Sequence, residues 1–308
     1  MNILKTLTTA YCALRPRAYI PDRLLSPLRF LLRLLTDSYF NIVRTRICFS
    51  NTNSVNSNIV VSLTSFPARI DNLWKVIASL KNQDVRPKKI ILWLSLEQFN
   101  AKNELPKTLL DCEDELFDIC MVEGDLRSHK KYYYAMNKYP GTTIVTVDDD
   151  IIYHPHTLSY LVEASNIYDN AIITNIGSKI KYTEGNICPY KEWNNVSREY
   201  ENNNVVQIGA GGVLYPPCSL ASMCLDESLF MKYAPMADDL WLNAMARIKK
   251  TQVVKSASHI LPMPVCSKTP SLYDENVGGG KNDKQLKSIR EYLINKLGVD
   301  VYDENYYG

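Results

Sequence analysis

The stretch TIVTVDDDIIYHP, residues 143–155, places three consecutive aspartates directly after a run of apolar and β-branched residues. Such a run is typical of a buried strand, and Asp148, Asp149 and Asp150 would repel one another at its end unless a cation or hydrogen-bond donors compensate them. Because side chains alternate along an extended chain, Asp148 and Asp150 can converge on one side while Asp149 points away. Two carboxylates with ligand oxygens are typical of a Mg²⁺ or Mn²⁺ site. The stretch therefore predicts a metal site, with a solvated acidic turn as the alternative.

On both sides of this stretch, apolar runs alternate with amphipathic segments. Strands are predicted at residues 59–63, 90–94, 119–122 and 143–147, and helices at residues 73–81, 105–117, 131–138 and 156–168. Strands that alternate with helices and are apolar along nearly their whole length indicate an α/β fold with a mostly parallel central sheet flanked by helices. Ligands of such sheets bind beyond the carboxyl ends of the strands. This directs attention to residues 64–69, 123–131 and 148–150.

A second acidic pair opens another predicted helix, in PMADDLW at residues 235–241. Aspartates in the first turn of a helix interact favourably with its dipole, so Asp238 and Asp239 can be explained without any chemistry. If the pair faces the same cleft as the first acids, one carboxylate could instead act as a general base that deprotonates a sugar hydroxyl. Both interpretations stay open on the sequence alone.

The net charge is distributed unevenly along the chain. The 308 residues carry a formal charge of only +2, which argues against a nucleic-acid binder. Residues 1–50 hold eight bases and two acids, a net charge of +6 that leaves −4 for the remaining 258 residues. A helix predicted over residues 21–46 has leucines on one face and Arg29 and Arg33 on another. The leucines are Leu24, Leu25, Leu28, Leu31, Leu32 and Leu35.

Two explanations of this basic amphipathic segment remain open. Such a helix can lie in the interface of an anionic membrane, or it can pack on the core of the chain's own body. The polar segment 51–58 is predicted to be a linker between this basic segment and the body of the chain.

The cysteines and the hydropathy bear on location. The eight cysteines form no CxxC pair and no cysteine–histidine cluster suited to zinc, so reduced thiols and a cytoplasmic location are expected. The first residues show no signal-peptide cleavage site. The longest charge-free stretch, residues 205–225, is interrupted by glycines and a Pro-Pro pair, which argues against a spanning helix there. We also expect the basic segment at residues 1–50 to bind peripherally to the inner face of the cytoplasmic membrane.

Five segments, in this order, resemble the GT-A-fold glycosyltransferases of the family-2 kind, in particular bacterial enzymes that build surface polysaccharide, capsule or lipopolysaccharide. The segments are VVSLTSFPARI, SLKNQDVRPKKIILWLS, GDLRSHKKYYYAMNKYPGTTIVTVDDDIIY, GAGGVLYPP and ADDLWLNAMA. The resemblance implies a single GT-A-like domain at residues 58–268. An N-terminal basic amphipathic segment and linker at residues 1–57 would precede it, and a Gly-rich loop and C-terminal helix at residues 269–308 would follow.

The resemblance also implies which residues bind the donor. The loop after the first strand would receive the nucleotide base and ribose, and the segment before the DxD strand would contact donor sugar and phosphate. Asp148 would lie near the ribose, and Asp150 would hold Mn²⁺ or Mg²⁺ on the diphosphate together with Asp148, with His259 as a further candidate ligand. The implied nucleotide-sugar-binding residues are Thr64, Ser65, Phe66, Arg69, Asp125, Arg127, Lys131, Asp148 and Asp149.

On the acceptor side, the resemblance implies that Gly211 and Gly212 lie beside the acceptor. Asp239 would be the general base, and Asp238 would orient it or bind the acceptor. A Gly-rich segment at residues 268–281 could close over the diphosphate as a lid.

These implications predict a metal-dependent, inverting glycosyltransferase of the hexosyltransferase type. It would move a sugar from a nucleoside-diphosphate sugar, UDP-sugar by default, to a hydroxyl of a saccharide or lipid-linked acceptor. One rival is a haloacid-dehalogenase-type phosphatase, whose strand–DxDx[TV] motif is similar to VDDDII. Several strand–helix units precede Asp148, however, and Ile152 stands where that motif has Thr or Val. The other rival is a non-catalytic, membrane-associated sugar-binding module.

Overall fold

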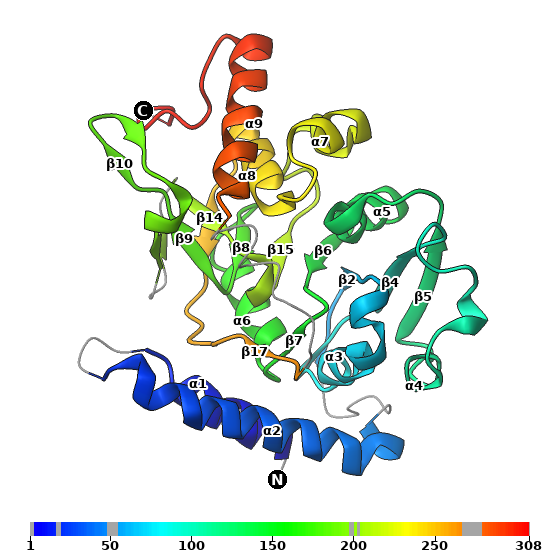
Figure 1. Cartoon of the computed structure of the whole chain (residues 1–308). Helices are drawn as coiled ribbons and strands as arrows, with labels where there is room; N and C mark the ends of the chain where they lie inside the picture. The colour runs from blue at the N-terminus through cyan, green and yellow to red at the C-terminus, as the bar shows by residue number, and fades with distance from the viewer. Residues whose placement is uncertain are drawn as a thin grey trace.

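The structure, a computed structural model, describes residues 3–16, 20–47, 55–196, 200–201, 204–266 and 279–307. Within them, an eight-stranded sheet crosses the body of the molecule (Figure 1). Six of its strands point the same way, whereas β15 runs antiparallel between β6 and β8 and β13 runs antiparallel to β16. The predicted mostly parallel α/β sheet is therefore confirmed. In spatial order the strands are β13 (Tyr200–Glu201), β16 (Val253–Lys255), β8 (Ile172–Thr174), β15 (Val213–Tyr215), β6 (Thr143–Thr146), β2 (Ile59–Thr64), β4 (Lys89–Ser95) and β5 (Phe117–Val122).

Helices cover both faces of the parallel part of the sheet, which explains why its strands are apolar along their whole length. Val60 of β2 packs with Ala135 of α5 (Lys130–Lys138) on one face. Its neighbour Val61 belongs to the cluster on the other face, formed by α3 (Leu73–Lys81) and α6 (Thr157–Ser165). Each strand thus contributes alternate side chains to two separate cores.

A third core lies beyond β15, around the fully buried Trp241. It is built by α7 (Glu227–Tyr233), α8 (Asp238–Lys249) and α9 (Lys281–Leu297). Leu286, Ile289 and Leu293 form the buried face of α9, with the three- and four-residue spacing of an amphipathic helix. This packing places the N-terminus of α8 against the sheet, where its first residues can meet the strand ends.

In the described part of the chain, four small sheets complete the fold. The most important for the site joins β7 (Ile151–Ile152) to β17 (Met263–Pro264), because β7 follows the three aspartates directly. The others are β9 (Gly177–Lys179) with β12 (Asn194–Asn195) and β14 (Val205–Gln207), β10 (Tyr182–Thr183) with β11 (Asn186–Ile187), and β1 (Val55–Asn56) with β3 (Val85–Arg86).

One predicted element was wrong. Residues 105–117 form no long helix: α4 spans only Lys107–Leu110, and β5 already begins at Phe117. The acids that follow α4 bind the next strand instead of continuing the helix. Asp114 accepts hydrogen bonds from the backbone N–H groups of Leu116 and Phe117, and Glu113 accepts one from Ile119. Acidic side chains that bind nearby backbone groups compete with helix formation.

The basic N-terminal segment forms two helices, α1 (Ile3–Ala13) and α2 (Asp22–Ile47), which lie along the lower side of the body in Figure 1. They pack on the body's core through buried Leu4, Tyr11 and Phe40. An ion pair from Asp37 to Lys75 of α3 adds to this contact. Of the two explanations for this segment, packing on the body is confirmed for one side of α2.

The predicted linker 51–58 falls partly outside the described residues. Its described end, Val55–Asn56, pairs in parallel with β3 and is thereby tied to the body. Among the described helices, none is both long enough and apolar enough to span a membrane.

Two phenylalanines of α2 allow its packing to be measured. Phe40 is fully buried and meets Trp74 edge-on, with 6.0 Å between ring centroids, whereas Phe30 is 56% exposed. Phe40→Ala should lower the free energy of unfolding by about 3–5 kcal/mol, because it leaves a cavity under the helix. The matched change Phe30→Ala should alter it by less than about 0.5 kcal/mol. Equal effects of the two substitutions in urea unfolding would contradict the described docking of α2.

Candidate active site

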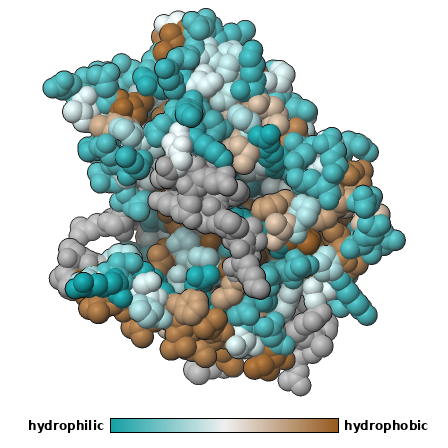
Figure 2. Space-filling model, in the orientation of Figure 1, coloured by the Kyte–Doolittle hydropathy of each residue, from teal (hydrophilic) through white to brown (hydrophobic). Residues whose placement is uncertain are grey.

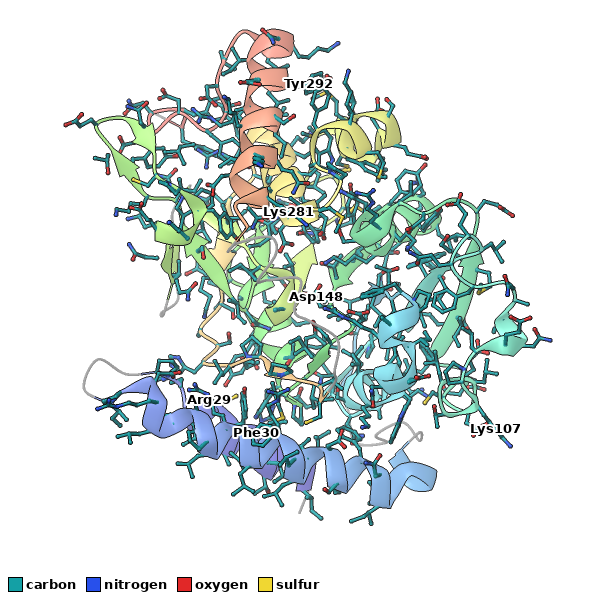
Figure 3. The ribbon with its side chains drawn as sticks, in the orientation of Figure 1. Arg29, Phe30, Lys107, Asp148, Lys281 and Tyr292 are labelled. Atoms are coloured by element: carbon teal, nitrogen blue, oxygen red, sulfur yellow. The ribbon has the colours of Figure 1, made fainter. Side chains whose placement is uncertain are left out.

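Two acidic groups from distant parts of the chain meet at the carboxyl edge of the sheet. The first follows β6 and contains Asp148, which lies near the centre of the molecule (Figure 3). The second is Asp238 and Asp239 at the start of α8. The predicted convergence of the two acidic motifs is found, because one lysine contacts both.

That lysine is Lys131, in the first turn of α5. Its ammonium lies 2.8 Å from Asp148 Oδ1 and 2.9 Å from Asp238 Oδ2, and its side chain is 6% exposed. Burial alone would lower the pKa of Lys131, but the nearby carboxylates of Asp148, Asp238 and Asp239 outweigh it and hold the pKa well above its ordinary value. Lys131 is therefore a permanent positive charge between the two acidic groups.

The backbone of Lys131 is also held, by residues that the sequence did not single out. Ser62 of β2 donates its hydroxyl to the carbonyl of Lys131, and Trp93 of β4 donates its indole N–H to Ser62 Oγ over 2.9 Å. This buried relay fixes the start of α5 to two strands. Neighbouring Lys130 turns elsewhere and pairs with Asp125.

Asp149 points inward, as the alternation along the chain predicts. Ser65 Oγ donates to its Oδ2 over 2.6 Å, and Arg69 donates to its Oδ1 over 2.6 Å. Both oxygens are thus used inside the protein, and the side chain is 8% exposed. These three predicted nucleotide contacts instead hold the loop after β2 against the acidic turn.

Asp148 and Asp150 are the two acids of the triplet that reach solvent, with side chains 30% and 34% exposed. Arg69 approaches Asp150 Oδ2 to 2.9 Å, while the backbone N–H of Asp148 donates to the hydroxyl of Tyr153 over 2.7 Å. Burial and the charge of Asp148 raise the pKa of Asp150 to about 6. The two carboxylates are therefore close enough to repel each other.

Asp148 and Asp150 are the residues of this centre that could hold a divalent cation. Within the described residues, two cations, Lys131 and Arg69, interact with five carboxylates. These belong to Asp148, Asp149, Asp150, Asp238 and Asp239. Carboxylate oxygens are ligands of the kind that Mg²⁺ and Mn²⁺ take.

Asp239 has one oxygen held and one free. The backbone N–H of Gly209 donates to Asp239 Oδ2 over 3.0 Å, whereas Oδ1 is buried and has no hydrogen-bond partner among the described residues. Burial and the charge of Asp238 raise the pKa of Asp239 to about 7. A carboxylate with an uncommitted oxygen and a pKa near neutrality is suited to accept a proton.

Asp238 differs from its neighbour. Burial would raise its pKa, but Lys131 and His129 outweigh burial and hold it below the ordinary value. Both aspartates lie in the first turn of α8, as the interaction with the helix dipole requires, and the N-cap residue Ala237 makes no side-chain capping bond. Their contacts with Lys131 and Gly209 come in addition to that interaction.

The glycine segment after β14 contacts the site through Gly209 and not through Gly211 or Gly212. A Cβ on Gly209 would lie 2.9 Å from Asp148 Oδ1 and 3.1 Å from Lys131 Nζ. Gly211 is packed against the backbone of Ile176, and Gly212 is buried with a φ of +80°. The two glycines predicted to lie beside an acceptor thus pack inside the sheet connection.

The remaining predicted residues are spread around this centre. Thr64 Oγ1 donates to the carbonyl of Trp93, Phe66 is half-buried with Arg69 stacked on its ring, and Arg127 is exposed with a φ of +53°. Asp125 binds Lys130 and Gln98. Of these four residues, Arg127 is exposed, and Thr64, Phe66 and Asp125 are half-buried.

His259 is not brought to the acidic centre. It is exposed, and burial, Arg15 and Lys255 lower its pKa. Within the described part of the chain, no group of three or more histidine, cysteine or acidic side chains has the geometry of a metal site. The predicted lid, residues 268–281, lies almost wholly outside the described residues.

Gln207 is a further residue of this centre that sequence analysis missed. Its side-chain amide donates to the carbonyl of Asp239 over 3.1 Å and to the hydroxyl of Tyr215 over 3.3 Å. The only signal in the sequence was its place two residues before Gly209. It fixes the turn of α8 that carries Asp239.

No protein-family model and no curated protein sequence matches the chain. Among solved structures, S. aureus TarS 1–349 in complex with UDP is similar, with 12% identity and a TM-score of 0.48 over 78% of this chain and 66% of that one. A UTP-bound UGPase from Acinetobacter baumannii has 10% identity and a TM-score of 0.44, over 79% and 94% of the two chains. The 4-diphosphocytidyl-2C-methyl-D-erythritol synthase from Anaerococcus prevotii has 11% identity and a TM-score of 0.42, over 76% and 97%. These likenesses are too distant to assign an activity.

The raised pKa of Asp239 predicts how stability changes with pH. The folded-state pKa of about 7 lies above the ordinary value of 3.8, so the folded protein keeps a proton that the unfolded chain has already released. The contribution of Asp239 to the free energy of unfolding is fully present below about pH 4 and is lost as the pH rises through about 7. Asp239→Asn removes the titration, so the variant should gain on the order of 1–4 kcal/mol over the wild type between about pH 4 and about pH 8. Urea unfolding across that range measures the difference, and a constant difference would contradict the assignment.

Proposed function

We propose that the chain is a metal-dependent glycosyltransferase that moves a sugar from a nucleoside-diphosphate sugar to a hydroxyl group of an acceptor. The observation that carries the proposal is the uncommitted, buried Oδ1 of Asp239. Asp239 adjoins Asp238, which Lys131 joins to Asp148. In the proposed reaction, Asp239 would accept a proton, and Asp148 would bind a diphosphate through a divalent cation.

Asp148 and Asp150 would hold Mg²⁺ or Mn²⁺ at the solvent-exposed part of the acidic turn. Such an ion would neutralise charge on the departing nucleoside diphosphate. Arg127, exposed before α5, could meet a phosphate, and Phe66 offers an aromatic face to a nucleotide base. Arg69 and Ser65 act indirectly, since they hold Asp149 and thereby the turn that carries the two ligands.

Asp239 would act as the general base. The acceptor oxygen forms a bond to the anomeric carbon as its proton passes to Asp239 Oδ1, and the bond from that carbon to the diphosphate oxygen breaks. Gly209 holds Oδ2 in place during the transfer, and Asp238 stays ionised beside Lys131. Because the hydroxyl attacks the face opposite the leaving group, the anomeric configuration would be inverted.

The donor nucleotide is proposed to be UDP, and the acceptor a saccharide or a lipid-linked saccharide. Nucleotidyl transfer is the neighbouring activity that the experiments must separate. It would yield pyrophosphate from a nucleoside triphosphate and a sugar phosphate, whereas the proposed reaction yields a nucleoside diphosphate. Incubation with each substrate pair and chromatography of the nucleotide products distinguishes the two.

Asp239→Asn should lower kcat by about 10²–10⁴-fold, because the variant has no base at the acceptor oxygen. Donor binding should stay within about twofold of the wild type, since Asp239 does not face the diphosphate in the proposed reaction. Isothermal titration with the donor and a transfer assay give the two readouts. Glu291→Gln, an exposed acid of α9, is the control and should leave both unchanged. Normal turnover by the Asn variant would refute the base assignment.

Asp150→Asn should remove the dependence of donor binding on metal. In a thermal-shift panel of UDP-, GDP- and dTDP-sugars, one of them should stabilise the wild type when Mn²⁺ is present. A ligand concentration of a hundred times Kd raises the free energy of unfolding by about 2.7 kcal/mol. The variant should lose at least about tenfold in donor affinity with Mn²⁺ and should change little without it. Absence of stabilisation of the wild type by every sugar nucleotide would count against the proposed function itself.

A further inference from the structure

The face of α2 that points away from the body is apolar over most of its length. Seven large apolar side chains of this helix are between 42% and 81% exposed. They colour the lower edge of the molecule in Figure 2, and Phe30 is labelled among them in Figure 3. We call this set the α2 stripe. Its members are Leu24, Leu28, Phe30, Leu31, Leu34, Leu35 and Ile42.

Five of the seven members of the α2 stripe form a line along the helix, and Phe30 and Leu34 lie to one side of it. Leu24, Leu28, Leu31, Leu35 and Ile42 recur every three, four or seven residues and therefore lie on one side of an α-helix. They extend over 18 residues, or about 27 Å at 1.5 Å per residue. This side is distinct from the one that carries Phe40 into the body. The helix thus has two apolar faces, and the body covers one of them.

The α2 stripe lies in positively charged surroundings. Both acids of α2 are neutralised within the protein, Asp22 by Arg29 and Asp37 by Lys75. The first fifty residues carry eight bases, among them the exposed Arg15 and Arg23. A second copy of this chain would bring the same positive charge against itself, whereas an anionic surface would be complementary to it.

We propose that the α2 stripe binds the surface of an anionic lipid bilayer, with α2 lying in the plane of the membrane. The apolar side chains would enter the boundary between headgroups and acyl chains, and the bases would meet the headgroup phosphates. The exposed length, the single apolar line and the sign of the charge all match an interfacial helix. The interaction needs no segment beyond the described residues.

This surface is connected to the acidic centre by a short path. Arg33 of α2 donates to the carbonyls of Pro264 and Val265 over 3.0 and 3.3 Å, and the N–H of Val265 donates to the carbonyl of Asp150 over 2.8 Å. The bound membrane would therefore lie at a fixed place relative to Asp150. Under the proposed function, a lipid-linked acceptor would then reach the site from a constant direction. Only this last consequence rests on the proposed function.

Vesicle binding of the full chain tests the proposal without any nucleotide sugar. The wild type should sediment with phosphatidylcholine vesicles that contain phosphatidylglycerol and bind pure phosphatidylcholine vesicles more weakly. Leu28→Gln/Leu31→Gln should lower the partition coefficient at least about tenfold. Ile294→Gln/Leu297→Gln is the matched control: it has the same spacing and similar exposure, but lies on α9 at the opposite end of the molecule. The control should bind like the wild type.

A second readout does not depend on loss of function. Leu31→Trp places an indole on the α2 stripe, and its emission should shift to shorter wavelength when anionic vesicles are added. The proposal is overturned if the wild type stays in the supernatant, if the two double variants bind alike, or if neutral and anionic vesicles bind equally. It is also overturned if the wild type dimerises through the α2 stripe without binding vesicles. Each of these results leaves the proposed transfer reaction untouched, because that reaction is measured separately.

Discussion

A single buried ammonium, that of Lys131, joins parts of the chain that are otherwise independent. It contacts Asp148 after β6 and Asp238 at the start of α8, two segments about ninety residues apart. Through its own carbonyl it is tied to Ser62, and through Ser62 to Trp93. A buried charge that loses its partner costs about 3–5 kcal/mol. The meeting of helix α8 with the strand ends therefore depends on this charge balance as much as on apolar packing.

The same charge makes two neighbouring aspartates unlike. Lys131 lies against Asp238 and holds its pKa down, so Asp238 keeps its charge at neutral pH. Burial and that fixed negative charge raise the pKa of Asp239 to about 7, although Lys131 acts in the opposite direction. Two residues identical in type thus have pKa values shifted in opposite directions. The backbone N–H of Gly209 then leaves one oxygen of Asp239 uncommitted.

Much of this could be predicted from the sequence, and the failures share one physical cause. The strands and α3 follow from local apolar pattern, and the meeting of two acidic motifs follows from the rule about strand ends. The failed helix at 105–117 depended on Glu113 and Asp114 binding the backbone of the next strand. The inward role of Arg69 required knowing that Asp149 lies across the turn. The contacts of Glu113 and Asp114 are local, and that of Arg69 joins residues 80 positions apart. Both kinds depend on specific side-chain hydrogen bonds, which no hydrophobic periodicity encodes.

The close approach of Gly209 to the acidic turn has a consequence for how this sequence can change. A Cβ at position 209 would lie 2.9 Å from Asp148 Oδ1 and 3.1 Å from Lys131 Nζ, so the three positions share one small volume. A larger residue at 209 could be accommodated only if the acid or the base retreated. In a divergent lineage, substitutions at 131, 148 and 209 should therefore occur together, as a coordinated set, and not one at a time.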